Sequence, residues 1–140
     1  EQQVQIRVVL HKQTIPTLVE LARFIAFNLR FVDEVALMGM EIKGFTKPNL
    51  SQLWMDPFNY KKILADAVSI LDDYGIRTKV FNHQLCVIDP SFEKFYVRSI
   101  SDWKNDYVKE CDKCFKRGMC GGFFSSNVEH RHSDFIRAFH

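Results

Sequence analysis

Polar and apolar residues alternate from residue 4 to residue 10, which is the pattern of a β-strand with one buried face. Thr14 and Pro16 then mark the start of a helix. Apolar residues recur at helical spacing from Leu18 onward, so the sequence predicts an amphipathic helix over residues 15–29.

A second β/α unit follows. Residues 35–38 are all apolar, which is typical of a strand buried on both faces and favours a parallel sheet. A long loop over residues 40–55 leads to Asp56 and a proline, which together form a strong helix start. That helix should end at Gly75, and residues 76–81 predict a third strand.

The order strand, helix, strand, helix, strand predicts an α/β fold with right-handed crossovers and a parallel sheet. Three parallel strands and two helices make an incomplete layer, so we expect a partial (β/α) barrel followed by a small Cys-rich extension. The sequence changes character after Asn82, which divides the chain into a barrel part (residues 1–82) and an extension (residues 83–140). Within the extension we expect a short helix from residue 101 to about residue 109 and a last helix over residues 127–140.

Composition excludes several classes of function. The 140 residues are 46% hydrophobic, enough for a buried core, and the formal net charge is +2. This charge does not suggest a nucleic-acid-binding surface. No apolar run approaches the ~20 residues of a membrane span, and the N-terminus lacks the features of a signal peptide. We therefore expect a cytoplasmic protein, without membrane or nucleic-acid partners, from which a segment upstream has been cut away.

Four cysteines carry the main candidate chemistry, with the spacing C-x24-C-x2-C-x5-C. Thiolates are soft ligands suited to zinc, iron–sulfur clusters and copper(I). Without a secretion signal, a disulfide framework is disfavoured. Unpaired structural cysteines remain an alternative, above all for the first cysteine, which lies in an apolar stretch. The predicted metal ligands, called the four-cysteine site below, are Cys86, Cys111, Cys114 and Cys120.

Basic residues and glycines surround the last three cysteines. The positive charges would favour thiolates and offset a negatively charged cluster, and the glycines would let backbone amides approach sulfur. These residues are Lys109, Lys113, Lys116, Arg117, Gly118, Gly121 and Gly122.

Several blocks of the sequence resemble one family. They are VALMGME at residues 35–41, the Asp-Pro helix start at residue 56, NHQLCV at residues 82–87, SISDWKN at residues 99–105 and CDKCFKRGMCGGFFS at residues 111–125. Together they resemble the C-terminal half of radical SAM maturases of the His-Xaa-Ser system, which are presumed peptide-modifying enzymes. The likeness covers nearly the whole chain, and the last block is its most specific part.

The resemblance implies two iron–sulfur clusters in the intact enzyme, of which this chain would hold only one. In this family a C-x3-C-x2-C loop holds a [4Fe–4S] cluster that binds S-adenosylmethionine, and no such motif occurs in this chain. The four-cysteine site would then hold an auxiliary [4Fe–4S] cluster, and the chain alone should not cleave S-adenosylmethionine. Glu41 and Asn82, at the ends of barrel strands, would contact cofactor or substrate in the intact enzyme.

The implied substrate is a peptide or protein. An exposed sheet edge has to be covered, so a homodimer through that edge is a further hypothesis. The alternative function is a small α/β binding module without catalytic activity, in which zinc takes the same four thiolates and staples the fold.

Other polar residues have simpler interpretations. Arg7 is expected to form a structural ion pair with Glu34 or Glu41. His130 and His132 are expected in an exposed polar tail. Further candidates near strand ends are His11 and Gly39.

Overall fold

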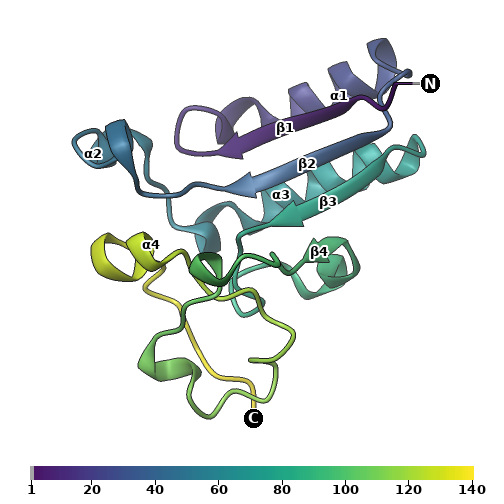
Figure 1. Ribbon diagram of the computed structural model, residues 1–140. Coiled ribbons are helices and arrows are strands. Elements are labelled where there is room, and N and C mark those ends of the chain that lie inside the picture. Colours follow the sequence, from purple (N-terminus) through teal and green to yellow (C-terminus); the bar gives the residue numbers. More distant parts are fainter. Residues whose placement is uncertain (1) are drawn as a thin grey trace.

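The computed structural model describes residues 2–140 and contains a four-stranded sheet (Figure 1). Its strands are β1 (Gln5–Leu10), β2 (Glu34–Gly39), β3 (Arg77–Phe81) and β4 (Tyr96–Val97). They lie in sequence order, and each neighbouring pair is parallel. The α/β class and the parallel sheet are therefore as the sequence predicts, with one strand more than expected.

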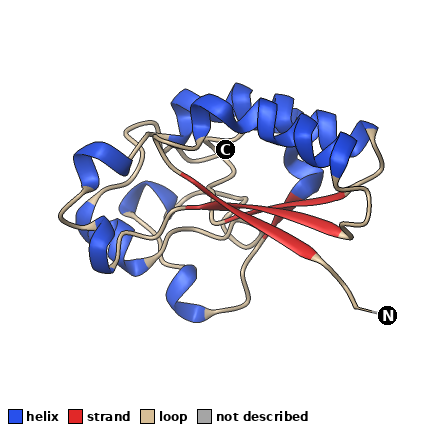
Figure 2. Cartoon of the chain, turned by 90° about the horizontal axis from the view of Figure 1, so that it is seen from above, coloured by secondary structure: helices blue, strands red, loops and turns tan. Residues whose placement is uncertain are grey.

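The two long helices, α1 (Leu18–Asn28) and α3 (Pro57–Asp73), lie on the same face of the sheet (Figure 2). Crossovers of one hand between consecutive strands place them there. In register across the sheet, Val8 pairs with Leu37 and Leu37 with Val80, and all three are buried in the core beneath the helices.

The opposite face of the sheet, which we call the open face, carries both polar and apolar side chains. By strand alternation it is formed by Gln5, Arg7, Val9, Glu34, Ala36, Met38, Arg77, Lys79 and Phe81. Glu34 is the first residue of β2: its carboxylate accepts a hydrogen bond from the Gln5 amide at 2.5 Å and pairs with the Lys79 ammonium at 2.8 Å. The Arg7 guanidinium donates to the Gln5 side-chain oxygen at 2.6 Å, so the expected pairing of Arg7 with Glu34 or Glu41 is wrong.

Local signals locate the longest helix correctly. The Asp56 side chain accepts a hydrogen bond from the backbone N–H of Phe58 at 2.9 Å, as an N-cap should. Gly75 follows the helix with φ +74°, as expected of a C-terminal cap.

Other boundaries differ from the prediction. The segment expected as a helix over residues 15–29 is a 3₁₀ turn (Ile15–Thr17) followed by α1. The loop over residues 40–55 contains a 3₁₀ turn (Gly44–Thr46) and the short helix α2 (Leu50–Leu53).

Residues 83–140, the C-terminal segment, have little regular structure. Their elements besides β4 are 3₁₀ turns at Pro90–Phe95, Asp102–Lys104 and Lys109–Cys111, and the helix α4 (Ser125–His130). The expected helix from residue 101 to about 109 is wrong because the backbone of Asp106 pairs with Phe123. The expected helix over residues 127–140 is wrong beyond His130, because the backbone of Arg131 is extended, Ser133 and Asp134 bind Asp56, and residues 134–135 form a turn.

The C-terminal segment packs against the carboxyl ends of the strands through amide side chains, of which Gln84 is buried and Asn127 partly buried. Asn127 donates to the Met40 carbonyl at 3.0 Å and accepts from the Ile42 N–H at 2.8 Å. Gln84 donates to the Gly122 carbonyl at 2.7 Å. A second small core forms in this segment around Leu85, Ile88 and Cys120. Within residues 2–140, no helix has the length and apolar character needed to cross a membrane.

Candidate functional site

The four cysteines line one cavity, although 34 positions separate the first from the last. Cys86 follows β3, Cys111 ends a 3₁₀ turn, and Cys114 and Cys120 lie in the loop after it. All four are free thiols; Cys120 is buried and the others are partly exposed. The structure thus brings together every predicted metal ligand around a single space.

Backbone N–H groups point at two of the sulfurs. The Gly122 N–H donates to Cys120 Sγ at 3.4 Å, and the Phe139 N–H donates to Cys114 Sγ at 3.4 Å. Gly122 has φ +66°, and a Cβ there would lie 2.2 Å from the Asp106 carbonyl oxygen, so only glycine fits. Such N–H···S bonds stabilise negative charge on a thiolate, whether the thiolate binds a cluster or a single ion.

The thiols affect one another electrostatically. Burial raises the pKa of Cys86, the nearby Cys120 and Cys111 raise it further, and a backbone hydrogen bond with Arg137 partly offsets these effects. Burial also raises the pKa of Cys111, with Cys120 and Cys114 adding to it. Binding of a metal would therefore have to displace protons from these sulfurs.

The donor set fits a soft metal centre, but its present geometry is not that of a single bound ion. Within residues 2–140, no three His, Cys, Asp or Glu side chains converge closely enough to hold one metal ion. The cavity between the thiols measures about 20 Å³, room for about one water molecule. Loading with either zinc or a cluster therefore requires the cavity wall to adjust.

Two basic side chains lie at this cavity. Lys116 and Arg117 line it, and Lys116 also pairs with Glu93 at 2.7 Å. The other two predicted lysines, Lys109 and Lys113, are exposed and are not among the lining residues. Half of the expected positive charge thus lies beside the thiols.

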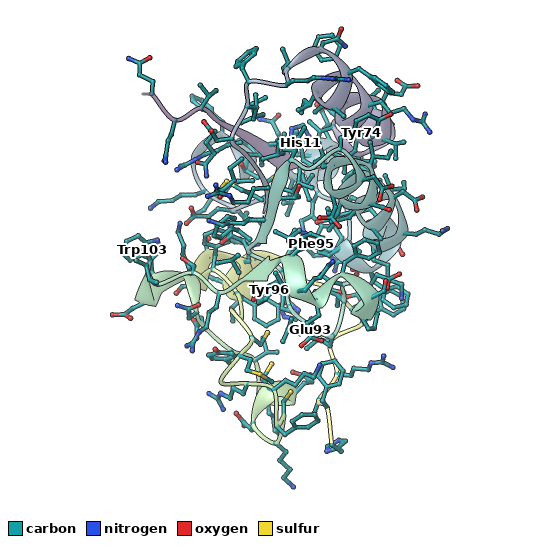
Figure 3. The ribbon with its side chains drawn as sticks, turned by 90° about the vertical axis from the view of Figure 1, so that its right-hand side faces the viewer. His11, Tyr74, Glu93, Phe95, Tyr96 and Trp103 are labelled. Carbon is teal, nitrogen blue, oxygen red and sulfur yellow. The ribbon has the colours of Figure 1, made fainter. Side chains whose placement is uncertain are left out.

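Two tyrosines support the cysteine loop, and the sequence analysis missed both. The Tyr107 hydroxyl donates to the Cys120 carbonyl at 2.7 Å, and the Tyr96 hydroxyl accepts from the Gly121 N–H. Burial raises the pKa of Tyr96 far above its usual range. Figure 3 shows Tyr96 where the sheet meets the lower part of the chain. The available signal was two tyrosines in the stretch just before Cys111.

A second cavity, the strand-end pocket, lies at the carboxyl ends of β1, β2 and β3. Its wall includes Gly39, Tyr60, Asn82 and, from the end of the chain, Arg131, His132 and Ser133. Asn82 has φ +60°, a left-handed conformation that is uncommon outside glycine. Its carbonyl lies so close to Gly39 that a Cβ there would be 2.3 Å from the oxygen.

The two residues predicted to contact the cofactor, Asn82 and Glu41, lie in different places relative to this pocket. Asn82 lines the strand-end pocket, whereas Glu41 is half-buried beyond the end of β2 and is not among the lining residues. The Asn82 side chain donates to the Gly39 carbonyl at 3.4 Å. His11 stabilises its own loop, because its Nδ1 accepts a hydrogen bond from the Gln13 N–H at 3.2 Å.

The C-terminal tail (residues 131–140) is only in part the exposed polar segment that we expected: His130 before it is exposed, whereas His132 is partly buried and Ser133 is buried. Ser133 is only 2% exposed, and its hydroxyl donates to the Asp56 carboxylate at 2.6 Å. His132 packs against Phe123, with ring centroids 5.3 Å apart. His130 lies 3.9 Å from Glu129 at the end of α4. The two histidines therefore have different surroundings.

Comparisons with family models, with curated proteins and with solved structures find no match. The functional argument therefore rests on the residues and geometry described above.

Proposed function

We propose that this chain is the C-terminal part of a radical SAM peptide or protein maturase and holds an auxiliary [4Fe–4S] cluster on the four-cysteine site. The observation that carries the proposal is that four free thiols, from separate parts of the chain, line one cavity. Four thiolates are the usual ligand set of such a cluster.

The surroundings of the thiols support this assignment. Two backbone N–H groups donate to sulfur, and Lys116 and Arg117 provide positive charge beside a centre whose thiolates are negative. A bound cluster would supply electron-transfer capacity or a binding position for substrate. The chain's own residues hold it and exclude water from one side through the buried Cys120.

The order of the strands and the position of the helices support the proposal that residues 1–82 belong to a (β/α) barrel. Four parallel strands in sequence order, with both long helices on one face, match a segment of a (β/α) barrel. A doubly wound sheet instead reverses its strand order and carries helices on both faces. The open face would then line the barrel interior, and the outer edge of β1 would pair with preceding barrel strands or with a second copy.

In the intact enzyme, the substrate and S-adenosylmethionine would lie at the carboxyl ends of the strands, where barrel enzymes bind their ligands. Asn82 is the residue of this chain best placed to contact them, because it lines the strand-end pocket. Glu41 is a weaker candidate, since it lies outside that wall in this structure.

The decisive experiment is anaerobic reconstitution of the chain with iron and sulfide, followed by iron and sulfide analysis and EPR of the reduced protein. We expect roughly four irons and four sulfides per chain, as a [4Fe–4S] cluster requires. Replacing any one of the four cysteines with serine should lower both contents and change the EPR signal. Met119→Ser is the matched control, because it removes an exposed sulfur next to Cys120 while keeping all four thiols.

Two results would overturn the assignment. A chain with all four cysteines that takes up no iron or sulfide would exclude the cluster; tight zinc binding in its place would favour the zinc-stapled binding module. The radical SAM part has its own test, because a gene without a C-x3-C-x2-C motif upstream of this segment would refute it even if the cluster forms.

A further inference from the structure

We propose that the C-terminal tail is a strap that transmits loading of the four-cysteine site to the wall of the strand-end pocket. This inference rests on the proposed function, because it requires that the four-cysteine site binds a metal centre. It assigns a role to residues 131–140, for which the sequence predicts only a last helix and a polar tail.

One end of the tail is fixed at the sheet. The Ser133 hydroxyl donates to Asp56 Oδ1 at 2.6 Å, and the Asp134 N–H donates to Asp56 Oδ2 at 3.0 Å. Asp56 is itself buried and caps α3, so this attachment joins the tail to a rigid helix. The Phe135 ring stacks on Phe58 with centroids 4.0 Å apart, which extends the same attachment.

The other end of the tail is fixed at the thiols. The Phe139 N–H donates to Cys114 Sγ at 3.4 Å, and the Phe139 carbonyl accepts from the Phe115 N–H at 3.1 Å. Arg137 and Phe139 both line the cavity of the four-cysteine site. In Figure 1 the tail runs from α4 near the sheet to the C-terminus at the far end of the molecule.

The same short segment therefore forms part of two cavity walls. Arg131, His132 and Ser133 line the strand-end pocket, and Arg137 and Phe139 line the thiol cavity. Only four residues separate Asp134, whose N–H binds Asp56, from Phe139, whose N–H binds Cys114 Sγ, so a short piece of chain joins the two attachments. A displacement at one end therefore acts on a segment that is also bound at the other end.

Loading must produce such a displacement. The thiol cavity has room for about one water molecule, so a [4Fe–4S] cluster would have to move its walls, which include Arg137 and Phe139. A single ion would instead have to draw the thiols together, since within residues 2–140 no three of them are placed to hold one ion. Once bound, the centre fixes the thiolates and the N–H groups that donate to them. The strap would then hold Arg131, His132 and Ser133 in one arrangement, so that the shape of the strand-end pocket depends on the state of the four-cysteine site; Gln84, which lines both cavities, is a second connection between them.

Hydrogen exchange of the full chain, measured by mass spectrometry before and after anaerobic loading with iron and sulfide, tests the strap. We expect the amides of residues 131–136 to exchange roughly fivefold more slowly after loading, the effect of about one hydrogen bond's stabilisation. Ser133→Ala removes the hydroxyl bond to Asp56 but keeps the bond from the Asp134 N–H, so it should weaken this slowing, while residues 137–139 still respond and the iron content is unchanged. Ser51→Ala, at an exposed position in α2, is the matched control and should respond like the unmodified chain.

A second variant tests the same attachment independently, in case Ser133→Ala does not fold. Phe135→Ala removes the stacking on Phe58 from a side chain that is 46% exposed, and it should weaken the response of residues 131–134 in the same direction. Unchanged exchange at residues 131–136 in a loaded chain, or an intact response in both variants, overturns the strap alone. A chain that takes up neither iron nor zinc overturns the strap together with the proposed function, and the metal analysis distinguishes the two cases.

Discussion

The Nε2 atom of His83 lies 2.9 Å from the hydroxyl oxygen of Tyr60, and both side chains are fully buried beneath the strand-end pocket. The Nδ1 atom of His83 lies 2.8 Å from the Phe81 carbonyl oxygen. Because a carbonyl oxygen only accepts, Nδ1 carries the proton and Nε2 accepts from Tyr60. The pair joins α3 to the end of β3, next to Asn82.

This pair predicts a pH-dependent stability. Burial lowers the pKa of His83 from about 6.5 to about 4. The unfolded chain therefore binds a proton that the folded chain excludes, so the free energy of unfolding falls as pH drops from about 6.5 to about 4, by roughly 3 kcal/mol in total. Urea unfolding between pH 7.5 and pH 4.5 checks this. His83→Gln should flatten the slope over this window, whereas the exposed His140→Gln should leave it unchanged.

The left-handed backbone of Asn82 gives a second prediction. At φ +60°, an ordinary side chain costs about 1–2 kcal/mol relative to glycine, and asparagine is among the residues that tolerate this region best. Asn82→Ala should lower the free energy of unfolding by about 1 kcal/mol, and Asn82→Gly should be nearly neutral. If both variants lose the same stability, the side-chain bond to Gly39 matters more than the backbone conformation.

Local sequence signals account for the parts of the fold that were predicted correctly. Asp56 and the proline after it mark the start of α3, and the apolar run at residues 35–38 marks β2, because capping and burial act within a few residues. The fourth strand and the course of the tail were missed. β4 has two residues, and Ser133 reaches Asp56 across 77 positions, so neither has a local signal.

The candidate site was predictable to a similar extent. Cysteine spacing identified all four cysteines that line the thiol cavity, since thiols have few other reasons to cluster. The supporting contacts of Tyr96, Tyr107 and Phe139 were not predictable, because they depend on how irregular segments pack together. Asn82 was expected at a strand end and is there, but its left-handed backbone has no signature in the sequence.

The glycines of the cysteine loop allow a matched comparison. A Cβ at Gly122 would meet the Asp106 carbonyl at 2.2 Å, whereas a Cβ at Gly118 would meet nothing within 4 Å. Gly122→Ala should break the backbone pairing of Asp106 with Phe123 and the N–H bond to Cys120, with a loss of about 2 kcal/mol or more and reduced iron uptake. Gly118→Ala should change neither quantity by much. Equal behaviour of the two variants in urea unfolding and iron analysis would contradict the close approach.

The open face of the sheet gives the last prediction. The hydrogen bond from Lys79 is the largest effect that lowers the pKa of Glu34, and Gln5 and Arg77 act in the same direction. A lowered folded pKa means that this stabilisation is present above the usual value of 4.5 and is lost as pH falls through the lowered pKa. Lys79 is 39% exposed, so screening limits the gain, and Glu34→Gln should cost less than about 1 kcal/mol at pH 7.

The same substitution should reduce the loss of stability below pH 4.5, and its effect at pH 7 should shrink as salt is added. Asp66→Asn is the control, because Asp66 pairs with Lys62 on the exposed side of α3, where both side chains are more than half exposed. Urea unfolding at low and high salt should show a smaller effect for the control than for Glu34→Gln. An equal effect would mean that the open face is as well solvated as the outer surface of the helices, and that its polar network adds no stability of its own.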